Sequence, residues 1–543
     1  KPMPANNGPL EVGMDDPLVT LKTDVVIEPL VERWHAWSHL VSPVTSSLNA
    51  KYRHLAVLES FVTAPSAHVA ACQNPKLRGG PFVDLPVSEV AAVKALIEST
   101  KTRQAKQIEF GDALRESFRM VMKQADGFSI EPLYEQLPEP VKGYVELTYT
   151  IGGYPDLRVN EPLLYLSPAY NRSVQSAAIY RAQGDERPFA FSTPKMPGPN
   201  IFELEEPFDA QIYDYLARLR HYPQRRSEVL AALKVGSDRA DLVSDFLTEA
   251  PPATLKPSEK TGKTRWRYFG HACVLVEAPD GTNMLMDPVV AYEGKSDLER
   301  FVLSDLPEHI DYVVLTHNHA DHVLIETLLA LRFRVDTIVV PAGGGSIADP
   351  SLKLMLQSIG FKNVIELDSL GTIESGDLTI KALPFLGEHG DLDVRSKAAW
   401  FVRSGETTML FAADSNNLDP VLYDLLRKAV GRVDVLFIGM ECAGAPFSWT
   451  YGPLLPVAVD RKKDQTRRLN GSDCEKGLKV VKSLGCSEVY VYAMGAEPWL
   501  QFITSIDPSE DTAPATNARQ LVAACETMGI KALRLFGKAD VTI

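Results

Sequence analysis

The spacing of apolar residues changes near residue 250, and this change divides the chain into two parts. Before it, residues 87–125 and 208–223 place apolar side chains every three or four positions, which is typical of amphipathic helices. Short apolar runs between them predict strands at residues 144–151, 163–167, 189–193 and 201–206. We therefore expect an N-terminal domain of mixed α+β structure over residues 1–250, with helix predominating.

Residues 251–265 are rich in Pro, Thr, Lys and Glu and show almost no apolar periodicity, so we interpret them as a linker. Apolar runs of strand length then recur through residues 266–543, separated by turns or helical patterns. Several of these runs end in Asp, Glu or His. This pattern predicts an α/β domain of layered sheets that carries a site on its strand-end loops.

Composition narrows the classes of partner. The chain has 543 residues, 45% of them hydrophobic, and a net charge of −14, which disfavours a nucleic-acid or anionic membrane surface. No apolar run approaches the roughly 20 residues that cross a bilayer, and the first 17 residues lack the apolar core of a signal peptide. The six cysteines are scattered, without a C-x-x-C pair. We expect a cytoplasmic protein with reduced thiols that binds neither nucleic acid nor membrane.

The stretch LTHNHADHV, residues 315–323, holds three of the chain's 11 histidines directly after an apolar strand. Residues 317 and 319 alternate and so point the same way, while residues 321 and 322 follow in the turn. Imidazole and carboxylate together can hold two metal ions side by side. The candidate metal ligands in this stretch are His317, His319, Asp321 and His322.

This H-x-H-x-D-H pattern resembles the metal motif of the metallo-β-lactamase superfamily, an αβ/βα four-layer sandwich with two metals between its sheets. The stretch GHACVLVEAPDGTNMLMDP, residues 270–288, resembles the superfamily's opening hairpin and places Asp287 beside the metals. The stretch MLFAADS, residues 409–415, resembles the strand that ends in the bridging aspartate, here Asp414. The resemblance implies a C-terminal metallo-β-lactamase-like catalytic domain over residues 266–543.

Most members of the superfamily are dizinc hydrolases with two further ligand histidines, and a lactonase or thioesterase is therefore one reading of this chain. After His322, however, the sequence contains only His389. In PFLGEHGDLD, Glu388 follows Gly387 where the hydrolases place histidine, so either Glu388 or, with a register slip, His389 is the ligand. The segment that would carry the C-terminal histidine offers Met494, Gly495 or Glu497.

A carboxylate-rich ligand set resembles that of the diiron β-hydroxylases of nonribosomal peptide biosynthesis. These proteins have a similar length, a large N-terminal domain and a glutamate that binds the metal directly at the position matched by Glu388. The resemblance implies two non-haem iron ions, O2 as co-substrate and an external electron donor. It also implies hydroxylation of an amino acid held as a thioester by phosphopantetheine on an acidic carrier domain of a nonribosomal peptide synthetase, and a homodimer. The implied ligands are His317, His319, Asp321, His322, Glu388 and Asp414.

Two further glutamates follow predicted strands whose ends we expect on the same side of the domain as the metal motif. Glu441, in DVLFIGMEC, would be a catalytic residue, as a late ligand or by holding a ligand, or would cap a surface loop. Glu497 carries the same ambiguity. Residues 461–473 contain five basic residues that would either dock an acidic carrier or form a solvated loop.

Overall fold

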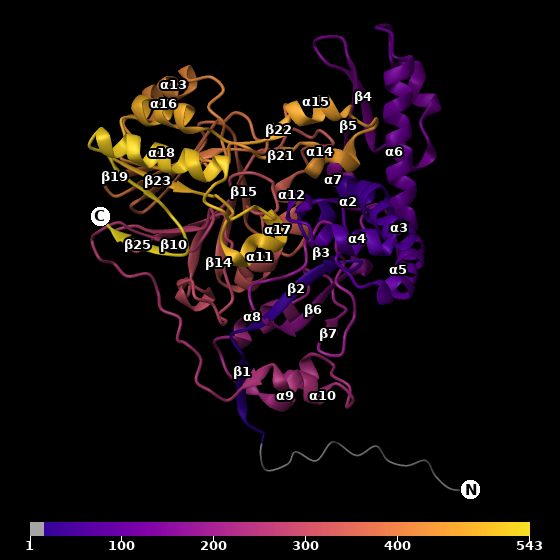
Figure 1. Cartoon of the computed structure of the whole chain (residues 1–543), viewed down its shortest axis with the longest axis horizontal. Helices are drawn as coiled ribbons and strands as arrows, with labels where there is room; N and C mark the ends of the chain where they lie inside the picture. Colours follow the sequence, from indigo (N-terminus) through magenta and orange to yellow (C-terminus); the bar gives the residue numbers. More distant parts are fainter. Residues whose placement is uncertain (1–15) are drawn as a thin grey trace.

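The computed structural model describes residues 16–543, and residues 265–543 form a sandwich of two seven-stranded sheets (Figure 1). The first sheet has the order β15-β14-β13-β12-β11-β10-β25. Its strands are β10 (Arg265–Tyr268), β11 (Val274–Glu277), β12 (Asn283–Met286), β13 (Ile310–Val314), β14 (Val335–Pro341), β15 (Val364–Leu367) and β25 (Ala539–Thr542). The second sheet, β16-β17-β18-β19-β20-β23-β24, consists of β16 (Thr372–Ser375), β17 (Leu378–Leu383), β18 (Ala399–Ser404), β19 (Thr407–Phe411), β20 (Val435–Gly439), β23 (Glu488–Tyr492) and β24 (Lys531–Arg534).

Both faces of each sheet are covered, which explains the continuous apolar runs in strands such as β11 and β12. Trp266, Trp400, Phe411 and Phe437 fill the space between the sheets. Helices α11 (Ile325–Leu331) and α12 (Leu352–Ser358) pack on the outer face of the first sheet. Helices α13 (Val421–Val430), α16 (Cys474–Leu484) and α18 (Ala513–Thr527) cover the second. The predicted αβ/βα four-layer sandwich is therefore confirmed.

The N-terminal part combines helices with two small sheets, β3-β2-β6-β7 and β8-β1-β9. Its strands are β1 (Leu18–Leu21), β2 (Val25–Val31), β3 (Trp34–His35), β6 (Gln175–Arg181), β7 (Phe202–Leu204), β8 (Gln224–Arg225) and β9 (Leu247–Thr248), with a separate hairpin of β4 (Val145–Tyr149) and β5 (Pro155–Val159). Its main helices are α1 (Ser38–Val41), α2 (Pro43–Asn49), α3 (Ala56–Thr63), α4 (Pro65–Cys72), α5 (Val90–Arg103), α6 (Ala105–Gln124) and α8 (Ile212–Leu219). Residues 251–264 contain no helix or strand, and the linker interpretation stays a prediction.

Two predicted strands of the N-terminal part are wrong. Residues 163–167 fall in helix α7 (Glu161–Leu164) and the turn after it, because Pro162 in the first turn favours a helix start. Residues 189–193 form a turn, because Pro188 and Pro194 flank the run and cannot donate to a strand ladder. In the part of the chain that the structure describes, no single helix is long and apolar enough to cross a membrane, and one pair bent by 107°, Pro43–Thr63 with Pro65–Cys72, reaches that length and apolarity only together.

A buried ion cluster joins the two parts of the chain. The Arg187 guanidinium lies 3.0 Å from the Glu28 carboxylate and 2.9 Å from the Glu326 carboxylate, which α11 of the sandwich contributes. His35 Nδ1 lies 3.1 Å from Glu28, and Arg187 also stacks on the Phe502 ring with its guanidinium carbon 3.9 Å from the centroid. Apolar residues of both parts form one continuous core beside this cluster. The N-terminal part is therefore fixed against the outer face of the first sheet.

Candidate metal centre

Loops from the carboxyl ends of strands in both sheets meet at one edge of the sandwich. The loop after β13 is the LTHNHADHV stretch, and the N-terminal part supports it, because Ser38 in α1 donates a hydrogen bond to Asn318. The polar side chains gathered at this edge are His271 after β10, Asp287 after β12, His317, His319, Asp321 and His322 after β13, Glu388 after β17, Asp414 after β19 and Glu441 after β20.

Several non-glycine residues at these strand ends adopt positive φ. His271 has φ 51°, Asp287 37°, Glu388 68° and Ala413 48°. Each such conformation costs on the order of 1–3 kcal/mol unless the surroundings hold it. Gly387, with φ 86°, precedes Glu388, and a Cβ there would lie 2.5 Å from the Cβ of Asn416. The GE pair is therefore fixed by local packing, which aims the Glu388 carboxylate into the cluster.

His317, His319 and Glu388 form one group whose ligand atoms all lie within 4.8 Å of one another. His317 Nε2 lies 3.1 Å from His319 Nδ1, which in turn lies 3.3 Å from Glu388 Oε1. His319 Nε2 faces the buried Tyr451 hydroxyl at 3.1 Å, so this contact leaves Nδ1 directed at the group. Burial lowers the pKa of His319 to about 4, so its imidazole is neutral at neutral pH and can donate a lone pair.

Asp321, His322 and Asp414 lie next to this group, and we call them the second group. His322 shares convergent ligand atoms with His271 and Asp321, and also with His317 and Asp414. His322 Nδ1 donates to Asp287 Oδ2 over 2.7 Å, which directs His322 Nε2 towards Asp414 Oδ2 at 3.1 Å and Asp321 Oδ2 at 3.6 Å. The same Asp414 oxygen lies 3.8 Å from His317 Nε2. Asp414 therefore lies between the two groups, where a bridging carboxylate would be placed.

His271 contacts this group, although the sequence analysis assigned it no role. The Gly495 N–H donates to His271 Nδ1 over 3.1 Å, so the ring carries its hydrogen on Nε2 and donates it to Asp321 Oδ2 over 3.0 Å. Glu497 accepts the His271 N–H at 3.0 Å and the Tyr268 hydroxyl, and its side chain therefore holds the loop instead of reaching the metal groups. The sequence signal for His271 was its position at the start of the opening hairpin, residues 270–288.

The donor set fits two metal ions. Burial opposes charging of His322, but the carboxylates of Asp414, Asp321 and Asp287 together hold its pKa well above the ordinary value, which shows an excess of negative charge. The buried Asp414 Oδ1 has no hydrogen-bond partner. Such an orphaned oxygen is costly unless a cation binds it. Imidazole and several carboxylates are ligands that suit iron.

The remaining candidates lie around the two groups. The His389 ring packs on His319, with centroids 4.7 Å apart, and its Nδ1 lies 3.1 Å from the Gly387 carbonyl. His389 belongs to neither group of convergent ligand atoms described above. Glu441 accepts the Gly444 N–H at 2.9 Å and also lies outside the groups, with burial raising the pKa of its carboxyl.

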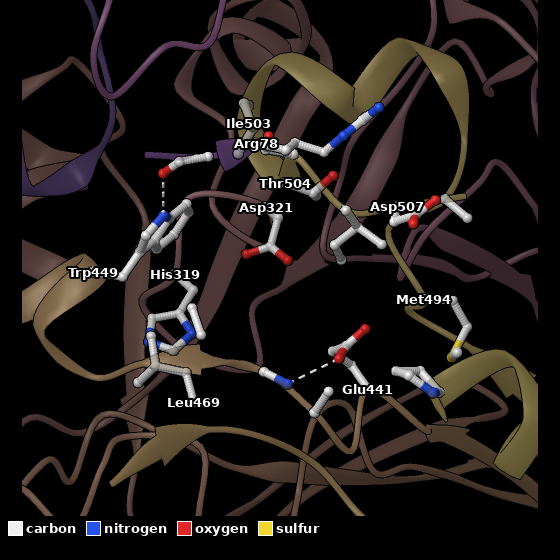
Figure 2. A pocket seen from close by; sticks show the side chains of 18 of the residues that line it. Arg78, His319, Asp321, Glu441, Trp449, Leu469, Met494, Ile503, Thr504 and Asp507 are labelled. Atoms are coloured by element: carbon white, nitrogen blue, oxygen red, sulfur yellow. Dashed lines mark hydrogen bonds between the residues drawn. The ribbon is translucent and has the colours of Figure 1, made fainter. Parts of the chain in front are cut away.

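A cavity of about 900 Å³ opens above the cluster. Figure 2 shows the Asp321 carboxylate pointing into it, with Glu441 and Met494 on other walls. Trp37 and Phe191 of the N-terminal part and Trp449 of the sandwich form an aromatic wall, in which Phe191 lies 4.9 Å from each neighbouring ring. The cavity therefore joins a charged floor to an apolar wall built by both parts of the chain.

Comparisons with known proteins agree with this arrangement. Residues 20–251 match the family model of the diiron non-haem β-hydroxylase N-terminal domain, and residues 282–446 match the β-lactamase superfamily domain. A 4-amino-L-phenylalanyl-[CmlP-peptidyl-carrier-protein] 3-hydroxylase from Streptomyces venezuelae is 36% identical over 95% of this chain and 98% of its own length. A metal-dependent hydrolase from Anaeromyxobacter is 29% identical, over 36% of this chain and 69% of its own.

Among solved structures, CmlA, a diiron β-hydroxylase from Streptomyces venezuelae, superposes with a TM-score of 0.90 at 34% identity. That match covers 97% of this chain and all of CmlA. The hydrolase reading has no comparable support, because its match covers 36% of this chain, whereas the β-hydroxylase match covers 95%. The chain therefore belongs to the family of non-haem diiron β-hydroxylases.

Proposed function

We propose that the protein hydroxylates the β-carbon of an amino acid held as a thioester on the carrier domain of a nonribosomal peptide synthetase. The observation that carries the proposal is the convergence of Glu388 with His317 and His319 at the floor of the cavity. The Streptomyces venezuelae relative acts on a carrier-bound aminoacyl group. An external electron donor belongs to the proposal, while the homodimer and the cytoplasmic location stay predictions.

The two groups of side chains would hold one iron each. His317, His319 and Glu388 would bind the first, and Asp321 and His322 the second, with Asp414 shared. When bound, the iron pair supplies the activation of dioxygen that C–H hydroxylation needs. The chain's own contribution is orientation: Asp287 fixes His322, Tyr451 fixes His319, and His271 fixes Asp321.

The cavity would position the substrate and exclude water from the reacting carbon. Its wall of Trp37, Phe191 and Trp449 favours a large apolar or aromatic side chain, because flat rings stack on it at low entropic cost. Glu441 would be a catalytic residue here, because its side chain lines the cavity and is available to a polar group of the substrate (Figure 2).

The experiment combines metal analysis with oxygen consumption. Protein produced without metal bias should contain about two iron ions per chain, one for each of the two groups of side chains described above. After anaerobic reduction it should consume dioxygen rapidly only in the presence of an aminoacyl-loaded carrier domain. The unloaded carrier is the control. Tightly bound zinc, together with cleavage of the thioester, would contradict the proposal and favour the hydrolase.

A further inference from the structure

A loop of the N-terminal part, which we name the lip loop and define as residues 75–82, lies at the mouth of the cavity. Trp449 Nε1 donates to the Gly79 carbonyl over 2.9 Å, which fixes the loop to the sandwich. Gly79 has φ 73°, and a Cβ added there would lie 3.4 Å from the Cβ of Ser505. The lip loop is therefore seated against the second half of the chain, so its side chains have a defined position at the opening.

Two cations of the lip loop, Lys76 and Arg78, line the cavity with exposed side chains. Within residues 16–543, neither forms an ion pair. By contrast, Arg534, which also lines the cavity, pairs with Glu510 at 2.9 Å. Figure 2 shows Arg78 beside Ile503 and Thr504, well separated from Glu441. The chain has a net charge of −14, yet these two cations at the entrance have no acidic partner among the described residues. This arrangement favours the binding of an anionic ligand.

We propose that Lys76 and Arg78 bind the phosphodiester of the phosphopantetheine arm that carries the substrate; this inference rests on the proposed function. The arm bears the thioester at one end and its phosphate at the other. When the aminoacyl end reaches the metal groups at the floor, the phosphate remains near the mouth. Arg and Lys are the side chains that bind phosphate oxygens by charge-assisted hydrogen bonds.

The other basic candidate is the segment of five cations at residues 461–468, which the sequence analysis weighed as a dock. Arg467 donates to the Gly390 carbonyl and Arg468 to the Ala443 carbonyl, so both serve the local fold. Lys462 and Lys463 are exposed on helix α15 (Arg461–Thr466), and neither lines the cavity. These two lysines therefore supply a matched control for charge removal.

The test compares 4′-phosphopantetheine with pantetheine as competitors of the loaded carrier. For the native protein, the phosphate should strengthen binding by about tenfold, the order expected for two exposed charge contacts. The preference should disappear in Lys76→Gln/Arg78→Gln, and remain in Lys462→Gln/Lys463→Gln and in the charge-keeping Lys76→Arg/Arg78→Lys. A preference that survives in Lys76→Gln/Arg78→Gln would overturn the inference. So would inorganic phosphate that competes as strongly as 4′-phosphopantetheine, because the site would then bind any phosphate.

Turnover separates this inference from the proposed function. Lys76→Gln/Arg78→Gln should raise the KM for the loaded carrier by about tenfold, with an effect that shrinks at high salt. Normal iron content in the same variant shows that its fold is intact. If that KM equals the native KM while hydroxylation proceeds, the phosphate site is wrong and the function stands. If the native protein prefers 4′-phosphopantetheine but hydroxylates no carrier-bound amino acid, the site stands and the proposed function is wrong.

Discussion

His271 offers the sharpest single test of how the metal groups are held. Its Nε2–H donates to Asp321 over 3.0 Å, and its side chain is 1% exposed. We predict that His271→Ala weakens binding of the second metal ion and leaves the first in place. His271→Gln should retain most of the affinity, because its amide can accept from Gly495 and donate to Asp321 in the same order.

The magnitude follows from the contact that is lost. A hydrogen bond to a charged carboxylate contributes about 1.5–3 kcal/mol. A loss of about 2 kcal/mol corresponds to roughly thirtyfold in affinity. This value lies within the tenfold to hundredfold effect that is typical of residues holding a metal ligand. Residue 271 has φ 51° in the native chain, and Ala and Gln are both L-residues with a Cβ, so we expect backbone strain to affect the two variants equally.

The assay is iron content after equilibration with a graded series of chelator concentrations. His309→Ala is the control, because His309 has an imidazole whose side chain is 61% exposed and lies outside the metal groups. Circular dichroism and thermal unfolding of each variant show whether the fold is retained. If His271→Ala held both irons with native affinity, the role of the Asp321 contact would be refuted.

Three other outcomes follow from the structure. Glu388→Ala should lose or severely perturb the metal pair while His389→Ala keeps two metals, as metal analysis would show; the reverse result would reassign the ligand. Arg187→Met should lower the free energy of unfolding in denaturant titrations by about 3–5 kcal/mol, because it leaves two buried carboxylates without their shared cation. The control is Arg158→Met, which removes an exposed ion pair and should lower it by about 1 kcal/mol or less. Burial lowers the pKa of His39 from 6.5 to about 3, so its contribution to stability is complete above pH 6.5 and is lost as pH falls towards 3. As pH falls from 6.5 to 5, the free energy of unfolding of His39→Gln should therefore decrease by about 2 kcal/mol less than that of the native protein. Denaturant titrations at the two pH values measure both decreases, and equal decreases would contradict this prediction.

The sequence predicted the sandwich well because its strands are buried on both faces and form long apolar runs bounded by turns. It predicted the N-terminal part less well. Strand β2 and helix α2 are buried almost throughout, so they lack the polar face that reveals an amphipathic period. Runs at residues 163–167 and 189–193 look like strands locally, but prolines and tertiary contacts decide their form.

The ligand motif was visible because its residues are close in sequence, whereas the contacts that orient it are long-range. His271 is 50 positions from Asp321, and Tyr451 is 132 positions from His319. No local spacing connects these pairs. The lip loop is similar: it comes from the N-terminal part, and its place at the mouth depends on the contact with Trp449.

The origin of the oxygen atom in the product tests the central claim most directly. Reduced, iron-loaded protein would be mixed with an aminoacyl-loaded carrier domain under isotopically heavy dioxygen, and the product would be analysed by mass spectrometry. We predict that one heavy oxygen appears on the β-carbon while the thioester stays intact. Release of the amino acid with oxygen taken from water would instead identify a hydrolase and contradict the account.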